Sequence, residues 1–362
     1  MTTLKARLSG KITFLLLIPV LLCGPRTAFG GEADSPGPNI QLRGGFHNSL
    51  YRFEKEKKGH VAFIGGSITA MNGYRPMLRG FLQKRFPETK FTFTNAGISS
   101  TCSTSGAFRL QRDVLSRGPV DLFFIEYAVN DDQDAGHARR ECIRGMEGIL
   151  RQTRFHNPMA DIVITHFVNP GMLKTVGKGK EPVSSGAHED VAKHYGVSTI
   201  HLIREVDRLI AAKELTWKKF GGTHPGPHGN RLCADMIEKL LTTSWSMSAA
   251  DKAAKAAHAL PKKPLDPESY GKGRFIDPAT AKIKTGWKNH LPEWKKIGGG
   301  FRNTFAGKKL LCATAPGAEC RLEFTGRAIG TYLLAGPDAG TVEASIDGGA
   351  FKPYDLYHRY SR

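Results

Sequence analysis

The sequence has no hydrophobic run long enough to cross a bilayer comfortably. Its N-terminal apolar stretch, 12–22, falls short of the roughly 20 residues that a membrane-spanning helix needs. Basic residues precede this stretch and the triplet Ala28-Phe29-Gly30 follows it, which is typical of an export signal. We therefore expect cleavage near Gly30 and a periplasmic or extracellular location. Cys23 follows Leu22, where a lipid anchor requires a small residue, so no membrane anchor is expected.

Cysteines are few, and their spacing is typical of neither a zinc site nor a redox pair. Six are present, and Cys23 leaves with the signal segment. The odd number that remains excludes a fully paired disulfide framework. Cys312 and Cys320 flank a Pro-Gly turn and could bridge in an oxidising compartment, and whether they pair is left open.

Acidic residues are scarce relative to basic ones, 33 against 52, so the formal net charge is +19. Such a charge favours anionic partners, nucleic acid among them. The lysines, however, cluster within 251–309 and do not alternate with aromatic residues as in a single-strand binding groove. We therefore interpret the charge as a solvated basic surface and expect no nucleic-acid partner.

Apolar runs and helical periodicities alternate along most of the chain. Strands are predicted at 61–64, 91–95, 120–127, 161–168 and 197–202. Helices are predicted at 74–86, 102–115, 137–155, 187–195, 203–213 and 230–241. This alternation predicts a doubly wound parallel sheet. The segment 171–186 lacks periodicity and is interpreted as a mobile loop over a site.

Composition divides the chain into five parts. After the signal peptide, 1–30, we expect an N-terminal arm at 31–58, an α/β domain at 59–248 and a linker at 249–270. The remainder, 271–362, has short β-like runs separated by Gly-rich turns. We predict strands there at 310–314, 320–325, 328–334 and 341–346. They indicate a small antiparallel β-sandwich, which is incomplete if the chain stops at Arg362.

Polar residues or glycines follow three predicted strands, and a histidine lies in a late loop: Ser67, Gly97, Asn130 and His224. The carboxyl ends of parallel strands are where open α/β folds place their ligands. A serine hydroxyl beside a neutral imidazole can attack a carbonyl, with the imidazole as general base. The backbone N–H groups of Ser67 and Gly97 and the side-chain amide of Asn130 could hold the oxyanion. The alternative for Ser67 is a simple helix cap.

Four short blocks in this order resemble an SGNH/GDSL-type hydrolase, a family of flavodoxin-like esterases and lipases. The blocks are Gly65-Gly66-Ser67, Asn95-Ala96-Gly97, Val129-Asn130-Asp131 and Thr223-His224-Pro225. The resemblance covers about 59–244. It implies a three-layer flavodoxin-like fold with Ser67 as nucleophile, His224 as base, and Gly97 and Asn130 as oxyanion donors.

Two positions depart from the family pattern. Gly66 replaces an aspartate that is not usually catalytic in the family, so little follows from it. Gly221 stands where the family usually has the acid that orients the base. Either a Ser–His dyad operates, or Asp131 or Asp132 substitutes for the acid. Since losing the orienting acid of a Ser-His-Asp enzyme can cost about 10⁴ in rate, reduced or absent activity stays open.

Several further residues are weighed against structural roles. Tyr74, Arg75 and His228 could line the substrate site, although a helix start, a surface position or a loop cap explains them as well. For His166, which ends a predicted strand, a role at the edge of the site and a structural role are equally favoured. Glu126 is interpreted as a paired, structural carboxylate.

No cofactor and no metal are expected, because the aspartates that follow Asn130 lack a glycine-centred calcium pattern. The sequence therefore predicts an exported serine esterase acting on a small-molecule or polysaccharide ester, with deacetylation of a carbohydrate as the preferred reaction. The alternative is a non-catalytic carbohydrate-binding or surface protein that retains the hydrolase fold.

Overall fold

The computed structural model describes residues 36–249, 254–301, 303–358 and 360–361. The expected signal peptide, 1–30, lies outside the described residues. Within them, no helix combines the length and the apolar character needed to cross a membrane.

A six-stranded sheet forms the centre of the α/β domain, in the order β1-β6-β5-β4-β2-β3. The strands are β1 (Ile40–Gln41), β2 (Lys58–Gly65), β3 (Lys90–Gly97), β4 (Leu122–Glu126), β5 (Asp161–Thr165) and β6 (Ser198–Ile200). All neighbours pair in parallel except β1, which runs antiparallel to β6 at one edge. The predicted doubly wound parallel sheet is confirmed, with one antiparallel edge strand supplied by the segment expected to be an N-terminal arm.

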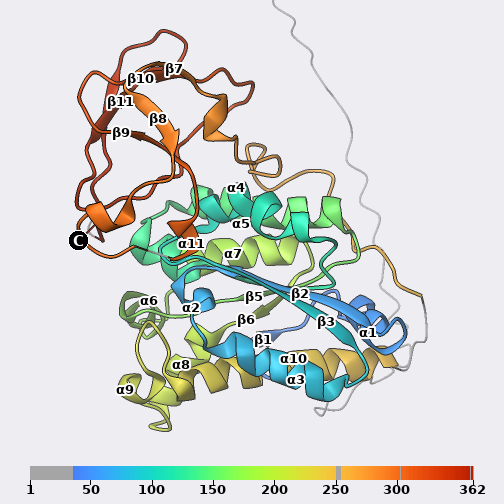
Figure 1. The fold of residues 1–362 in the computed structure, drawn as a ribbon. Helices are drawn as coiled ribbons and strands as arrows, with labels where there is room; N and C mark the ends of the chain where they lie inside the picture. The colour runs from blue at the N-terminus through green and yellow to red at the C-terminus, as the bar shows by residue number, and fades with distance from the viewer. Residues whose placement is uncertain (1–35, 250–253, 302, 359, 362) are drawn as a thin grey trace, which may run out of the picture. The chain divides into compact units, whose positions relative to one another are not determined.

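Helices cover both faces of the sheet because the central strands are apolar on both (Figure 1). In β2, Val61 and Phe63 enter one buried cluster, whereas Ala62 and Ile64 enter the other, as the alternation of a strand requires. One cluster includes residues of α1 (His47–Glu54), α3 (Tyr74–Arg85), α8 (Leu202–Ala211) and α10 (Pro227–Ala249). The other includes residues of α4 (Ser103–Asp113), α5 (Arg139–His156) and α7 (Val183–His194).

Short elements connect these layers. They are α2 (Ser67–Ala70), α6 (Pro170–Val176), α9 (Trp217–Phe220), a 3-10 turn at Leu115–Arg117 and a π-helical turn at Asn130–Asp134. The prediction of a loop at 171–186 is wrong, because α6 and the start of α7 occupy most of this segment. Asn169 caps α6 by accepting a hydrogen bond from the Met172 N–H at 2.8 Å, and Met172 is buried in the core.

The C-terminal region contains three small antiparallel sheets, each of two strands. The pairs are β7 (Lys282–Thr285) with β10 (Glu319–Arg321), β8 (Trp287–His290) with β9 (Leu310–Ala313), and β11 (Thr341–Ala344) with β12 (Lys352–Asp355). Short helical turns lie at Pro278–Thr280, Trp294–Lys296 and Asn303–Ala306. The strand predicted at 328–334 does not form. Cys312 on β9 and Cys320 on β10 are both free thiols, so the bridge left open by the sequence is not made.

The expected linker, 249–270, packs against the α/β domain over its described part. Asn48 of α1 exchanges hydrogen bonds with the backbone of Ala256, at 2.8 and 2.9 Å. The buried carboxylate of Glu147 on α5 accepts the N–H groups of Leu265 and Asp266. These contacts make the segment part of the domain surface, while the domain boundaries given above stay predictions.

Candidate active site

The nucleophile candidate, Ser67, sits where β2 turns into α2. Gly66 occupies the cap position of this helix, and a Cβ on Gly66 would lie 1.9 Å from Oδ1 of Asn130. The turn therefore needs glycine at 66, because the loop after β4, which carries Asn130, passes directly against it. Ser67 is half-buried and begins α2, so its backbone N–H has no partner within the helix.

Ser67 and His224 meet in the structure, although 157 positions separate them in the chain. Nε2 of His224 lies 2.8 Å from Oγ of Ser67, which is hydrogen-bonding distance for a base and the proton it removes. His224 is exposed and belongs to the loop between α9 and α10. The arrangement can therefore deprotonate the hydroxyl while leaving it open to a ligand.

Asn230 fixes the loop of His224, and sequence reasoning missed it. Its buried amide donates to the carbonyls of Pro225 and Gly226, at 2.6 and 3.0 Å. Its Oδ1 accepts the backbone N–H of Tyr74 at 2.9 Å. One side chain thus joins the loop of His224 to the helix that follows Ser67. Its three partners are settled by folding, so no local sequence signal could have identified them.

The three predicted oxyanion donors differ in their availability. Asn130 is buried, and its Nδ2 donates to Asp134 at 2.6 Å while its Oδ1 has no hydrogen-bond partner among the described residues. Nδ2 carries a second hydrogen. The N–H of Gly97 donates to Oδ1 of Asn95 at 2.9 Å. Asn95 is exposed, so its side chain has room to leave. Asn95 stands in one of the four sequence blocks, but its sequence position gives no sign of this contact with the Gly97 N–H.

The two candidate orienting acids are engaged elsewhere. Asp131 is fully buried and accepts the N–H and the hydroxyl of Ser103, at 2.8 and 2.6 Å, and Nε2 of His188 at 2.9 Å. Burial opposes ionisation, but hydrogen bonds from His137 and His188 hold the pKa of Asp131 well below its usual range. Asp132 accepts the side chain of Asn169 at 2.8 Å. The structure therefore does not bring either carboxylate to His224.

Gly221 is required by the backbone of this loop. Its φ is +104°, and a Cβ there would lie 1.9 Å from the nitrogen of Gly226. An acid at this position would be strained and would collide with the loop. No described residue makes a hydrogen bond to Nδ1 of His224. The pair Ser67–His224 therefore lacks a side-chain acid in this structure.

Two of the three candidate substrate-lining residues are structural. Tyr74 is fully buried in the core and its hydroxyl lies 3.1 Å from Oγ1 of Thr69, so neither a lining role nor a surface position fits it. Arg75 donates to the carbonyls of Ala70 and Met71, both at 3.0 Å, and closes the end of α2. His228 is exposed on the first turn of α10 and remains a candidate.

Two buried ionisable residues, Glu126 and Arg109, contact the backbone or side chains next to the site. Glu126, at the end of β4, accepts the hydroxyl of Thr69 at 3.1 Å, and burial raises its pKa to about 7. Arg109 is fully buried and donates to the carbonyls of Gly65 and Ala96, at 3.1 and 2.6 Å. It therefore ties together the ends of β2 and β3, which carry Ser67 and Gly97. Its position on the apolar side of α4 is the only sequence signal for this role.

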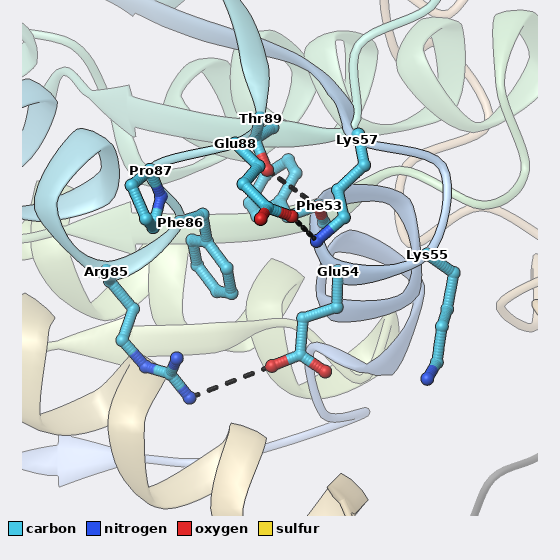
Figure 2. A pocket seen from close by; sticks show the side chains of 9 residues that line it. All are labelled: Phe53, Glu54, Lys55, Lys57, Arg85, Phe86, Pro87, Glu88 and Thr89. Atoms are coloured by element: carbon cyan, nitrogen blue, oxygen red, sulfur yellow. Dashed lines mark hydrogen bonds and ion pairs between the residues drawn. The ribbon is translucent and has the colours of Figure 1, made fainter.

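A separate hollow of about 320 Å³ lies at the other end of the sheet (Figure 2). It is lined by residues next to the starts of β2 and β3, and ion pairs join Lys57 to Glu88 and Arg85 to Glu54. Since β2 has eight residues, each rising about 3.3 Å, this hollow is not part of the Ser67–His224 site.

The solved structures most similar to this chain include a two-domain esterase active on acetylated mannans. Its crystal structure with mannopentaose matches with a TM-score of 0.65 and 19% identity, covering 89% of this chain and 84% of the other. A second structure of such an esterase matches with a TM-score of 0.60 and 22% identity, covering 77% and 73%. At 19% and 22% sequence identity, these similarities establish the fold alone.

Comparison with curated protein sequences finds no match. Residues 63–232, however, match the sequence profile described as the GDSL-like Lipase/Acylhydrolase family. This region holds all four blocks and every residue of the Ser67–His224 site. The α/β domain of this chain therefore belongs to the GDSL-like lipase/acylhydrolase family, a family of ester hydrolases.

Proposed function

We propose that the chain is an exported serine esterase that removes acetyl groups from a carbohydrate. The observation that carries the proposal is the 2.8 Å contact between Nε2 of His224 and Oγ of Ser67. In the first step His224 accepts the hydroxyl proton as Oγ attacks the ester carbonyl. The oxyanion that forms faces the Ser67 N–H and the free hydrogen of the Asn130 amide. Collapse releases the sugar hydroxyl, which takes the proton back from His224, and leaves an acyl-serine.

Water then removes the acyl group by the same steps, with His224 as the base for the water molecule. The base acts without a side-chain acid on its second nitrogen, so we assign a Ser–His dyad. Exposure of His224 leaves that nitrogen to solvent. Gly97 joins the oxyanion donors once the side chain of Asn95 moves from its N–H.

Two observations support a carbohydrate ester as the substrate. The similar two-domain esterases are described as active on acetylated mannans. The C-terminal region also exposes three aromatic side chains that are close in sequence, Phe351, Tyr354 and Tyr357, and exposed apolar side chains can form a binding surface. Export is supported by the N-terminal charge and hydropathy pattern.

The test combines covalent labelling with turnover. An organophosphonate should label Ser67, as seen by peptide mass spectrometry, and Ser67→Ala should abolish release of acetate from acetylated mannan and of p-nitrophenol from its acetate. Ser116→Ala is the matched control, because Ser116 is an exposed serine in the 3-10 turn that follows α4. Turnover by Ser67→Ala at the wild-type rate would refute the serine mechanism. Glycan binding without hydrolysis or labelling would favour the non-catalytic alternative.

A further inference from the structure

Three buried side chains gather on one side of β5 and β6, apart from the dyad. His166 follows β5, His201 follows β6, and Glu189 lies on α7. Their exposed fractions are 0%, 2% and 8%. Three separate elements therefore deliver two imidazoles and one carboxylate to a single buried point.

Hydrogen bonding leaves this cluster incomplete. Neither ring nitrogen of His166 has a hydrogen-bond partner among the described residues, and the same holds for Oε2 of Glu189. Buried polar atoms are nearly always paired in folded proteins. One ligand atom of each residue lies close to those of the other two, so a single shared ligand would satisfy Oε2 of Glu189 and one ring nitrogen of His166.

The separations fit the edges of a metal coordination shell. Oε2 of Glu189 lies 3.1 Å from Nε2 of His201 and 3.5 Å from Nε2 of His166. One ligand atom from each residue lies within 4.8 Å of the others. Zinc binds imidazole nitrogen and carboxylate oxygen at about 2.0–2.2 Å, so ligands in a tetrahedral shell stand about 3.3 Å apart.

We propose that His166, Glu189 and His201 bind a divalent transition metal ion of the zinc type. Two imidazoles and one carboxylate form a donor set that suits this class of ion. The proposal goes beyond the esterase reaction, and no spacing in the sequence indicates it.

The surroundings prepare Glu189 for this role. Arg43 holds Oε1 of Glu189, which leaves Oε2 directed to the two histidines. The buried hydroxyl of Thr199 forms a hydrogen bond with Nε2 of His201 at 3.2 Å, and metal binding through that nitrogen would replace this one bond. Bound metal would fasten α7 to the ends of β5 and β6 (Figure 1). Its role is therefore structural.

A neighbouring group, Asp131, Cys142 and His188, also has its atoms close enough to hold an ion. Asp131 is already satisfied by Ser103 and His188, so a metal there would have to displace formed hydrogen bonds. The two sites differ in one testable respect, because only the group around Asp131 contains a thiol.

Cobalt(II) is the probe that distinguishes metal binding at His166, Glu189 and His201 from binding at the group around Asp131. The full chain is stripped with a chelator and titrated with Co²⁺ while its visible spectrum is followed. The expected result is saturation at one ion per chain, with the strong ligand-field bands of a tetrahedral site and no thiolate charge-transfer band, followed by displacement on adding Zn²⁺. Absence of these bands, or a thiolate band, would overturn the proposal.

The variant Glu189→Gln should lose at least tenfold in cobalt affinity. His60→Gln is the matched control, since His60 is a buried histidine whose ring nitrogens already contact Pro119 and Thr94, at 3.0 and 2.9 Å. It should bind cobalt as the wild type does. A folded Glu189→Gln protein with unchanged affinity would contradict the assignment, and the wild-type titration decides the matter if that variant does not fold.

Discussion

The dyad should depend strongly on Asn230, which touches neither Ser67 nor substrate. In Asn230→Asp, the retained oxygen still accepts the Tyr74 N–H, but the amide nitrogen that donates to Pro225 and Gly226 becomes an oxygen. Two buried hydrogen bonds are thereby replaced by contacts between oxygens. Because Pro225 directly follows His224 in the chain, the loop that carries the base must move away.

The size of the effect follows from these contacts. Each buried carbonyl that loses its donor costs about 1–3 kcal/mol, so the variant should lose on the order of 4 kcal/mol of stability. A displacement of the base by about 1 Å can cost 10²-fold in rate. We therefore expect kcat/KM for p-nitrophenyl acetate to fall about 10²-fold, in protein that circular dichroism shows to be folded.

Asn48→Asp is the control for stability alone. Asn48 is also buried and donates to two carbonyls, those of Met159 and Ala256, at 3.1 and 2.8 Å, while accepting the Ala256 N–H at 2.9 Å. It lies on α1, outside the dyad and its loops. Its variant should lose similar stability and keep kcat/KM within about threefold of the wild type, since no catalytic group moves. Wild-type kcat/KM in folded Asn230→Asp, or an equal loss in Asn48→Asp, would refute the reasoning.

Three further variants test the site's other features. Gly221→Asp should lower the unfolding free energy by at least about 1 kcal/mol in urea titrations without raising kcat, because φ is +104° there; faster turnover would contradict this. Asn95→Ala should keep or increase kcat, since it frees the N–H of Gly97, and a fall of about 10²-fold would instead make Asn95 a donor to the oxyanion. Glu126 has a folded pKa raised by burial to about 7 from 4.5, so the folded protein holds a proton that the unfolded chain releases, and stability should fall as pH rises between these values. Glu126→Gln should flatten this dependence in urea titrations at about pH 5 and about pH 8, and an unchanged slope would show that Glu126 does not titrate there.

The central part of the site could be predicted from sequence for a geometric reason. In a parallel sheet, the residues that follow each strand meet at one edge. Identifying the strands before Ser67 and Asn130 therefore placed both residues at that edge, and the order of the blocks indicated His224. The contact of 2.8 Å between Ser67 and His224 agrees with that reasoning without any knowledge of the loops between.

The sequence predictions that the structure contradicts also failed for local reasons. Tyr74 is predicted at the surface or in the substrate site because it follows the nucleophile, yet its spacing of four from Leu78 places it on the apolar side of α3, where it is fully buried. The segment 171–186 is predicted as a loop because it lacks apolar periodicity, whereas Asn169 followed by Pro170 is a helix start. Apolar residues at 328–334 form no strand because no neighbouring strand pairs with them.

The two departures from the family pattern share one physical cause. At Gly66 and at Gly221 a Cβ would lie only 1.9 Å from an atom of a neighbouring segment, Asn130 in one case and Gly226 in the other. Both glycines thus permit close approach of loops that carry catalytic candidates. The absent acid at 221 is therefore coupled to the tight loop that presents His224 to Ser67. Restoring the acid by a single substitution must disturb the loop it is meant to serve, and no substitution at 226 relieves the collision, because the atoms in the way are backbone atoms of Gly226.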